Sequence, residues 1–291
     1  MDFLSYLING LGLGSVYAII ALGYTMVYGI AKMLNFAHGD VIMVGAYVAF
    51  FSISNLGLPL IPAVLLSIVV CTVLGVVIER LAYKPLRAAS ALSVLITAIG
   101  VSYFLQNAAQ LLWSSSTKVF PPVIAGGGIS WNGLTVSWLT LITIGVCVLV
   151  MICLTLFINH TKTGRAMRAC SEDKGASTLM GINVNLMISI TFAIGSGLAA
   201  IASILLCAAY PSVFPTLGAM PGIKAFTAAV FGGIGSIPGA FLGGLLLGVI
   251  EIFAKAYIST QLSDAIVFAV LILVLLIKPT GLLGKRIREK V

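Results

Sequence analysis

Long runs of apolar residues constrain most strongly what this chain can fold into. Residues 139–158 contain no charged side chain. A helix of this length spans the roughly 30 Å hydrocarbon core of a bilayer. The chain is 60% hydrophobic and only 8% charged, against about 25% charged residues in a soluble domain. These features predict an integral membrane protein.

The apolar runs favour helices over a transmembrane β-barrel. Barrel strands alternate apolar and polar residues over about ten positions, and these runs do not alternate. The length predicts an all-α polytopic membrane protein with about eight to ten transmembrane or re-entrant helices, in a single domain over residues 1–291. The candidate segments are residues 7–30, 41–54, 58–78, 91–113, 138–158, 186–209, 223–253 with a break, and 265–277.

The net charge of +8 indicates topology rather than nucleic-acid binding. Most cations lie in three short stretches beside apolar runs, as in cytoplasmic loops that follow the positive-inside rule. The three groups are Arg80, Lys84 and Arg87; Lys162, Arg165, Arg168 and Lys174; and Lys278, Lys285, Arg286, Arg288 and Lys290. With these groups inside, the N-terminus is predicted to be periplasmic, residues 114–137 external and the C-terminus cytoplasmic.

With the basic groups inside, the span 186–209 runs outward and the span 265–277 runs inward. Residues 223–253, which lie between them, must therefore leave and return on the outer side. Four glycines and a proline interrupt this segment, and such residues break helices. They are Gly232, Gly233, Gly235, Pro238 and Gly239. We therefore expect a hairpin of two shorter helices. Each half of the chain, about 1–113 and about 186–291, then has one span, a returning pair and one span, which suggests an inverted repeat.

Asn35, His38 and Asp40 lie in a polar stretch between the first two candidate spans. An imidazole and a carboxylate beside the membrane could relay protons or bind a cation. Alternatively, this stretch is a capped turn in which Asp40 begins the next helix.

Three amides interrupt the candidate span 91–113, namely Gln106, Asn107 and Gln110. They could line a translocation pathway or form hydrogen bonds between helices. Both interpretations stay open.

Other polar and small residues have simpler explanations. Glu79 is expected to be solvated or to snorkel at a membrane edge. Glu251 and Lys255 are four residues apart and are expected to pair with each other. Glycines spaced by four, such as Gly10 and Gly14 or Gly244 and Gly248, predict close helix packing.

An enzymatic function has little support in the sequence. The nucleotide-binding pattern G-x-x-x-x-G-K-[ST] is absent, as are HExxH and G-x-S-x-G, and the chain has only two histidines. The five cysteines are spread singly, without paired metal-ligand spacing. We predict a protein that is not an enzyme and holds neither metal nor cofactor.

The polar segment 161–185 stands out in this apolar chain. It can form a short amphipathic helix that ends at Gly181 and docks a partner, or it can be a solvated loop that only enforces topology. The candidate docking residues are Gly164, Arg165, Arg168, Ala169, Glu172, Asp173, Ala176, Met180, Gly181 and Ile182.

Several motifs together resemble the LivH-type permeases of bacterial branched-chain amino-acid ABC transporters. They are LNFAHGDVIMVGAY from Leu34, IERLAYKPLR from Ile78, GRAMRACSEDKGASTLMGIN from Gly164, PGIKAFTAAVFGGIGSIPGAFLGG from Pro221 and IKPTGLLG from Ile277. These motifs occur in order over nearly the whole chain.

The resemblance implies an inner-membrane subunit that imports leucine, isoleucine and valine. Its implied partners are a second homologous permease, two cytoplasmic ATPase subunits that bind ATP and Mg²⁺, and a periplasmic substrate-binding protein. Segment 164–182 would then couple ATPase closure to transport. Related permeases serve urea, short amides or other amino acids, and no residue here separates these cargoes. A self-sufficient proton-coupled carrier that uses His38, Asp40 or Glu79 is the competing class.

Overall fold

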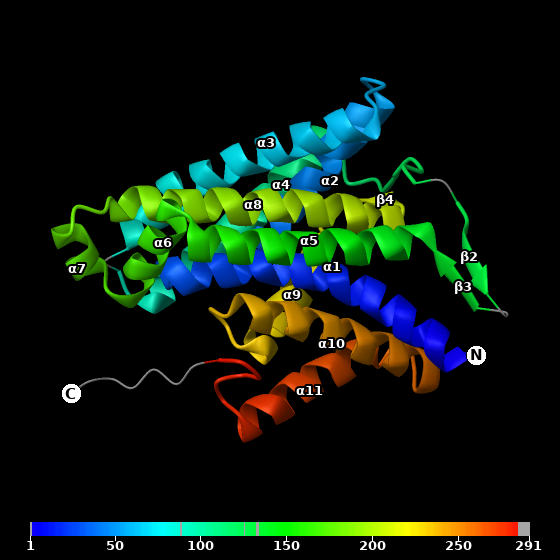
Figure 1. Cartoon of the computed structure of the whole chain (residues 1–291). Coiled ribbons are helices and arrows are strands. Elements are labelled where there is room, and N and C mark those ends of the chain that lie inside the picture. Colours follow the sequence, from blue (N-terminus) through cyan, green and yellow to red (C-terminus); the bar gives the residue numbers. More distant parts are fainter. Residues whose placement is uncertain (1, 88, 125, 132–133, 285–291) are drawn as a thin grey trace.

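The computed structural model describes residues 2–87, 89–124, 126–131 and 134–284. Most of the long helices run along one axis of the molecule (Figure 1). Within these residues, six helices are long and apolar enough to cross a membrane: α1 (Asp2–Ala31), α3 (Leu60–Ile78), α4 (Ala91–Trp113), α5 (Trp138–His160), α8 (Val184–Ala209) and α10 (Ile237–Tyr257). Two shorter apolar helices, α2 (His38–Ser54) and α11 (Ser263–Ile277), accompany them in the described residues, together with the short helix α9 (Ala219–Gly232). The predicted all-α polytopic fold is confirmed.

Short strands cover one end of the bundle, which the sequence did not predict. They are β1 (Lys118–Val119), β2 (Gly128–Trp131), β3 (Leu134–Ser137) and β4 (Ser212–Val213). Strand β1 pairs with β4, and β2 pairs with β3, both antiparallel. The β1–β4 pair joins the segment between α4 and α5 to the residues that follow α8, so these two connections share one end of the molecule.

Helix α1 is the centre of the bundle and packs on α10 through glycines. A Cβ atom added at Gly10 would lie 2.8 Å from the Cα of Val249, and one added at Gly14 would lie 2.8 Å from the Cα of Leu245. A Cβ at Gly248 would overlap Gly14. The two backbones therefore approach as closely as small residues permit, which confirms the packing predicted from the glycine spacing.

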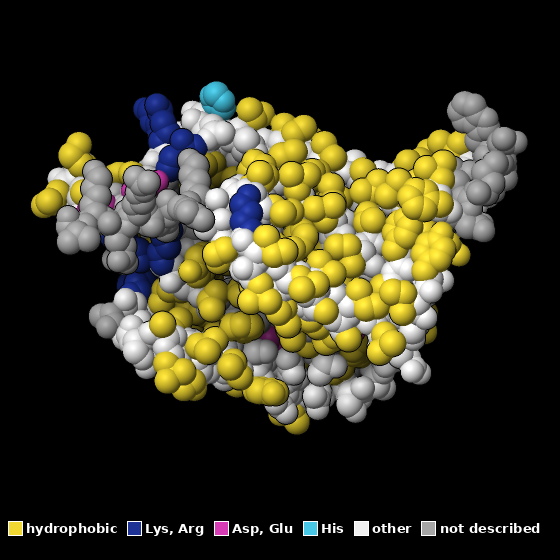
Figure 2. Space-filling view, turned by 90° about the horizontal axis from the view of Figure 1, so that it is seen from below, with side chains coloured by type: hydrophobic (Ala, Val, Ile, Leu, Met, Phe, Trp, Pro, Cys, Tyr) yellow, Lys and Arg dark blue, Asp and Glu magenta, His cyan; other side chains and the backbone are white. Residues whose placement is uncertain are grey.

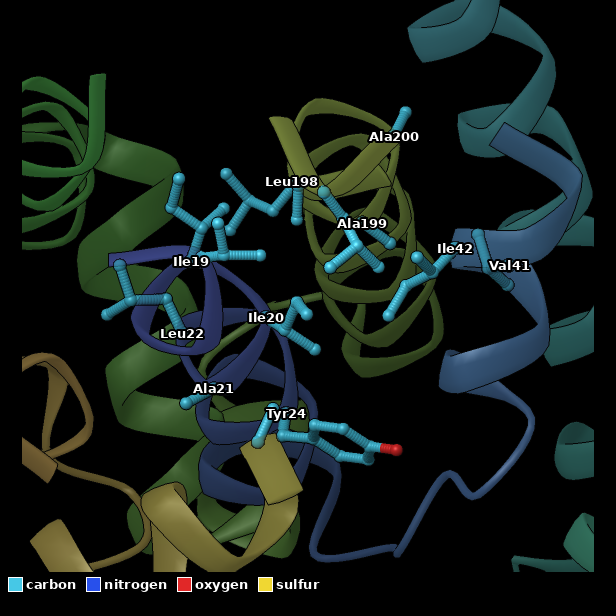
Figure 3. Close-up of a cluster of buried hydrophobic side chains, with 14 of the residues drawn as sticks. Ile19, Ile20, Ala21, Leu22, Tyr24, Val41, Ile42, Leu198, Ala199 and Ala200 are labelled. Carbon is cyan, nitrogen blue, oxygen red and sulfur yellow. The ribbon is translucent and has the colours of Figure 1, made fainter. Parts of the chain in front are cut away.

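Helix α8 is the second enclosed helix. Leu198 and Ala199 of α8 lie between Ile19 and Ile20 of α1 on one side and Ile42 of α2 on the other (Figure 3). Helix α8 packs on α2 and α3, while α1 packs on α9 and α10. The first helix of each predicted half thus packs on the helix pair of the other half. The inverted repeat itself stays a prediction.

The predicted helix break is confirmed. Helix α9 ends at Gly232, and Gly233 and Gly235 follow with φ of +107° and +94°, which L side chains rarely adopt. The Ser236 hydroxyl accepts a hydrogen bond from the Gly239 N–H and so caps α10, with Pro238 in its first turn.

The chain returns to this break after α11. The N–H groups of Leu282 and Leu283 donate to the carbonyls of Phe231 and Gly232, both at 2.9 Å. These bonds satisfy carbonyls that the end of α9 leaves without a partner. The PTGLLG motif therefore caps the re-entrant helix.

Cationic side chains gather at one end of the bundle (Figure 2). The Lys174 ammonium donates to the carbonyl of Ala31 at 3.0 Å, and Arg87 donates to the Asn185 amide oxygen. Two of the three predicted basic groups therefore share one end. In the third group, Lys285, Arg286, Arg288 and Lys290 lie outside the described residues, as does Met1.

The contact between α1 and α10 generates a stability prediction. Gly248→Ala forces the two helices apart and should cost about 1–3 kcal/mol, as overpacking generally does. Gly145→Ala on α5 is the matched control, because a Cβ there would meet nothing within 4 Å. Thermal unfolding in detergent should show a lower melting temperature for Gly248→Ala only. Equal melting temperatures for both variants would contradict the packing role.

Candidate functional site

The predicted site residues fall in two places. One is the polar segment between α5 and α8, at the basic end of the bundle. The other is a cavity in the interior, where α2 and α9 begin.

The polar segment forms two helices, α6 (Lys162–Glu172) and α7 (Lys174–Leu179). The prediction of a single helix is wrong, because Asp173 adopts an extended conformation and its carboxylate accepts a hydrogen bond from the Ala176 N–H at 2.9 Å. Asp173 therefore ends one helix and caps the next. Gly181, with φ of +81°, follows α7 as predicted.

Helix α6 has one apolar face, and this face is firmly packed. Met167 and Cys170 are buried against Met26 and Ile30 of α1 and Met187 of α8. Gly164 is also buried, and a Cβ added there would collide with the backbone at the end of α5. The segment is thus joined to both enclosed helices and is not a free loop.

The opposite face of the segment is open. Arg165, Arg168, Glu172 and Ala176 are exposed, while Ala169 and Ile182 are partly buried. At the tip, Leu179 and Met180 are 91% and 82% exposed. A charged face that ends in two exposed apolar side chains can bind another protein.

Lys174 joins α7 to the end of α1. Its ammonium reaches the Ala31 carbonyl, and partial burial together with the nearby charges of Arg87 and Lys32 lowers its pKa. The contact with the Ala31 carbonyl fixes the segment to the basic end.

In the interior, α2 and α9 begin with their first turns in contact. A Cβ at Gly39 would lie 2.6 Å from the Gly218 carbonyl, and one at Gly222 would lie 3.0 Å from the Gly39 Cα. With 17 and 14 residues, these helices are about 26 and 21 Å long, too short to cross the hydrocarbon core. Their N-termini therefore meet inside the protein, where two helix dipoles present their positive ends.

A cavity of about 240 Å³ lies beside this junction. It is open between α4 and α9, where Ile99 and Ile223 are each 42% exposed. Its polar side is formed by Tyr24, Asp40, Ser102 and Gln106, and its apolar side includes Phe36, Ile99, Tyr103 and Ile223. The lining residues of α4 lie midway along that helix, so the cavity lies at middle depth.

Asp40 and Gln106, predicted from separate motifs, meet in this cavity. The Gln106 amide donates to Asp40 Oδ1 at 2.9 Å and also contacts the Ser102 hydroxyl at 3.2 Å. Asp40 is 1% exposed and lies in the first turn of α2. Asp40 thus lies at the start of the helix, as the capped-turn interpretation predicts, but its side chain does not cap the helix.

The other polar candidates lie elsewhere. Asn35 accepts a hydrogen bond from the Tyr83 hydroxyl at 2.9 Å, and the His38 ring packs against Gly23 and the edge of Tyr24. Asn107 and Gln110 are exposed on α4. None of these four side chains lines the cavity.

Glu79 is not solvated, contrary to expectation. It is fully buried, pairs with Arg87 and accepts a hydrogen bond from Ser189 of α8 at 2.6 Å. A short π-helical turn (Glu79–Tyr83) after α3 allows this inward position. The pair joins the end of α3 to α8.

A second buried carboxylate, Glu251, holds a larger network. The predicted pair with Lys255 is present at 2.6 Å. Lys224 of α9 also reaches Glu251 at 2.9 Å and Asp264 at 2.6 Å, and the Tyr17 hydroxyl donates to Glu251 at 2.9 Å. The network connects α1, α9, α10 and α11.

The sequence did not identify Lys224 or Tyr24 as candidate site residues. Lys224 could have been found, because a lone cation within an apolar segment is a candidate functional residue. Tyr24 carried no signal, since it is one of several tyrosines in an apolar run and only the fold brings it to the cavity.

Comparisons with known proteins agree over nearly the whole chain. The family described as "Branched-chain amino acid transport system / permease component" matches residues 6–275. The high-affinity branched-chain amino acid transport system permease protein BraD of Pseudomonas aeruginosa is 50% identical over 99% of this chain and 98% of its own length. LivH of Escherichia coli K12, a permease protein of the same description, is 47% identical with the same coverage. A probable LivH of Methanocaldococcus jannaschii is 28% identical over 93% of this chain and 89% of its own length.

The buried ion pair generates a second stability prediction. Arg87→Met leaves the Glu79 carboxylate buried without a cation, and breaking a buried pair in this way generally costs about 3–5 kcal/mol. Arg80→Met is the matched control, because Arg80 lies one residue away from Glu79 and is exposed. Arg87→Met should lower the melting temperature and the yield of folded protein, whereas Arg80→Met should not. Similar behaviour of the two variants would contradict a structural role for the pair.

Proposed function

Because the chain belongs to the family of branched-chain amino-acid transport permeases, we propose that it is a membrane subunit of an ATP-driven importer of leucine, isoleucine and valine. The observation that carries this proposal is the family match over residues 6–275. The helical bundle supports it, since it is a multi-pass membrane protein with irregular backbone enclosed at middle depth.

The energy for transport is proposed to come from other chains. The sequence contains no P-loop, and the exposed face of α6 and α7 supplies a surface on which two ATPase subunits can act, one here and one on a sister permease. ATP and Mg²⁺ would bind those subunits. A periplasmic binding protein would deliver the amino acid to the opposite end, near β1 and β4.

The orientation follows from the charge distribution. The basic end, with Arg87, Lys174 and the α6 cations, is proposed to face the cytoplasm of a bacterium. The N-terminus would then be periplasmic and the C-terminus cytoplasmic. The exposed apolar faces of α3, α4 and α5 would contact lipid or the sister permease.

An uptake assay tests the cargo. A bacterium that lacks its own branched-chain amino-acid transporters, supplied with this chain and its partner subunits, should accumulate labelled leucine but not urea. Proteoliposomes that contain this chain alone should not transport leucine in the absence of ATP. Urea uptake would favour the related cargo class, and transport by the chain alone would favour the proton-coupled carrier.

The docking role of α7 gives a coupling prediction. The double variant Leu179→Ala, Met180→Ala should lower substrate-stimulated ATPase activity of the assembled transporter about tenfold, because it removes the exposed apolar tip. Arg168→Ala and Glu172→Ala should lower it as well. Leu149→Ala is the control, since Leu149 is an exposed apolar residue in the middle of α5, away from both ends of the bundle. Wild-type coupling in all docking variants would exclude this surface.

A further inference from the structure

The buried carboxylates differ in how their charge is balanced. Glu79 pairs with Arg87, and Glu251 pairs with Lys224 and Lys255. Asp40 is equally buried, yet no cation of the described residues pairs with it, and its side-chain neighbours there are the neutral Gln106 amide and Ser102 hydroxyl. A buried carboxylate is costly unless a cation compensates it. The cavity beside Asp40 can admit such a cationic group from outside the chain.

The same cavity also offers groups for an anion. The first turns of α2 and α9 meet at its wall, and helix N-termini favour negative charge. The Tyr24 hydroxyl points toward the first turn of α9, 3.4 Å from where a Cβ at Gly222 would lie. Tyr24 is 5% exposed, and its hydroxyl forms no hydrogen bond with the described residues. The hydroxyl oxygen is not among the fully buried atoms that lack a partner, so it is accessible from the cavity and can donate to a ligand there.

These features together select against simple ions. A bare cation would be drawn to Asp40 but repelled by the two positive helix ends. A bare anion would be drawn to the helix ends but repelled by Asp40. A ligand that carries both charges a short distance apart satisfies both, and discontinuous helices bind amino-acid carboxylates in this manner in other transporter folds.

We propose that this cavity is a transient binding site for the zwitterionic head of an aliphatic amino acid during translocation. The α-ammonium pairs with Asp40, and the carboxylate faces the first turns of α2 and α9 and the Tyr24 hydroxyl. The aliphatic side chain contacts Phe36, Ile99 and Ile223 on the apolar side. This inference rests on the proposed function and names the residues that would contact its substrate.

The volume and the opening fit this use. At about 240 Å³ the cavity is smaller than the roughly 300–1,000 Å³ of drug-sized sites, which suits a small amino acid. Its partly exposed lining residues Ile99 and Ile223 belong to α4 and α9. A sister permease packed on that side would complete a shared pathway.

Asp40→Asn in the complete reconstituted transporter tests the charge. Asparagine can still accept the Gln106 hydrogen bond, so the variant removes the charge and keeps the packing. Leucine import per ATP hydrolysed should fall at least tenfold for Asp40→Asn and several-fold for Tyr24→Phe. ATPase activity stimulated by the loaded binding protein is measured in the same samples, so that loss of import per ATP is separated from loss of assembly. Tyr28→Phe, one turn away on α1 and outside the cavity lining, should import normally.

Import by Asp40→Asn within twofold of wild type would overturn the site while leaving the proposed function intact. Failure of the wild-type assembly to import leucine would instead overturn the proposed function. If the variants do not assemble, a leucine analogue with a photoreactive diazirine in its side chain decides the question on the wild-type transporter. During turnover it should label residues 36–40, 99–106 or 219–223, and labelling confined to other segments would overturn the site.

Discussion

The close packing of α1 against α10 is the contact on which the rest of the bundle depends. In a bilayer, apolar side chains gain little by leaving lipid, so van der Waals contact between backbones must hold the helices together. Gly10 and Gly14, about one turn apart on α1, and Gly248 of α10 permit this approach. Once α1 is held there, α8 can pack on its other side, and the two halves interlock.

Enclosure by α1 and α8 makes the irregular centre possible. Backbone that leaves a helix within a membrane must find partners inside the protein. The start of α2 does so, because the Asp40 and Val41 N–H groups both donate to the Ala37 carbonyl. The end of α9 does so through Leu282 and Leu283. The half-helices are therefore stable only as part of the complete bundle.

Much of this architecture could be predicted from the sequence, because spans, the glycine break and the glycine spacing are local patterns. The positions of charged side chains could not. The sequence predicts that Glu79 is a charge at the membrane edge, yet a π-helical turn directs its side chain inward to Arg87. The break at Asp173 and the meeting of Asp40 with Gln106 likewise depend on tertiary contacts. The sequence shows which residues are polar, but only the packing of the helices decides which of them share a site.

The docking segment and the cavity are joined by one rigid element. Met167 and Cys170 of α6 pack on Met26 and Ile30 of α1, and Tyr24 precedes Met26 by two residues on the same helix. A close-packed interface resists gradual deformation, so a displacement of α6 must shift α1 or break this contact. A shift of α1 carries Tyr24 relative to the first turn of α9. If an ATPase subunit docks on α6 and α7 as proposed, its closure changes the cavity directly, without a relay of charged residues between the two sites.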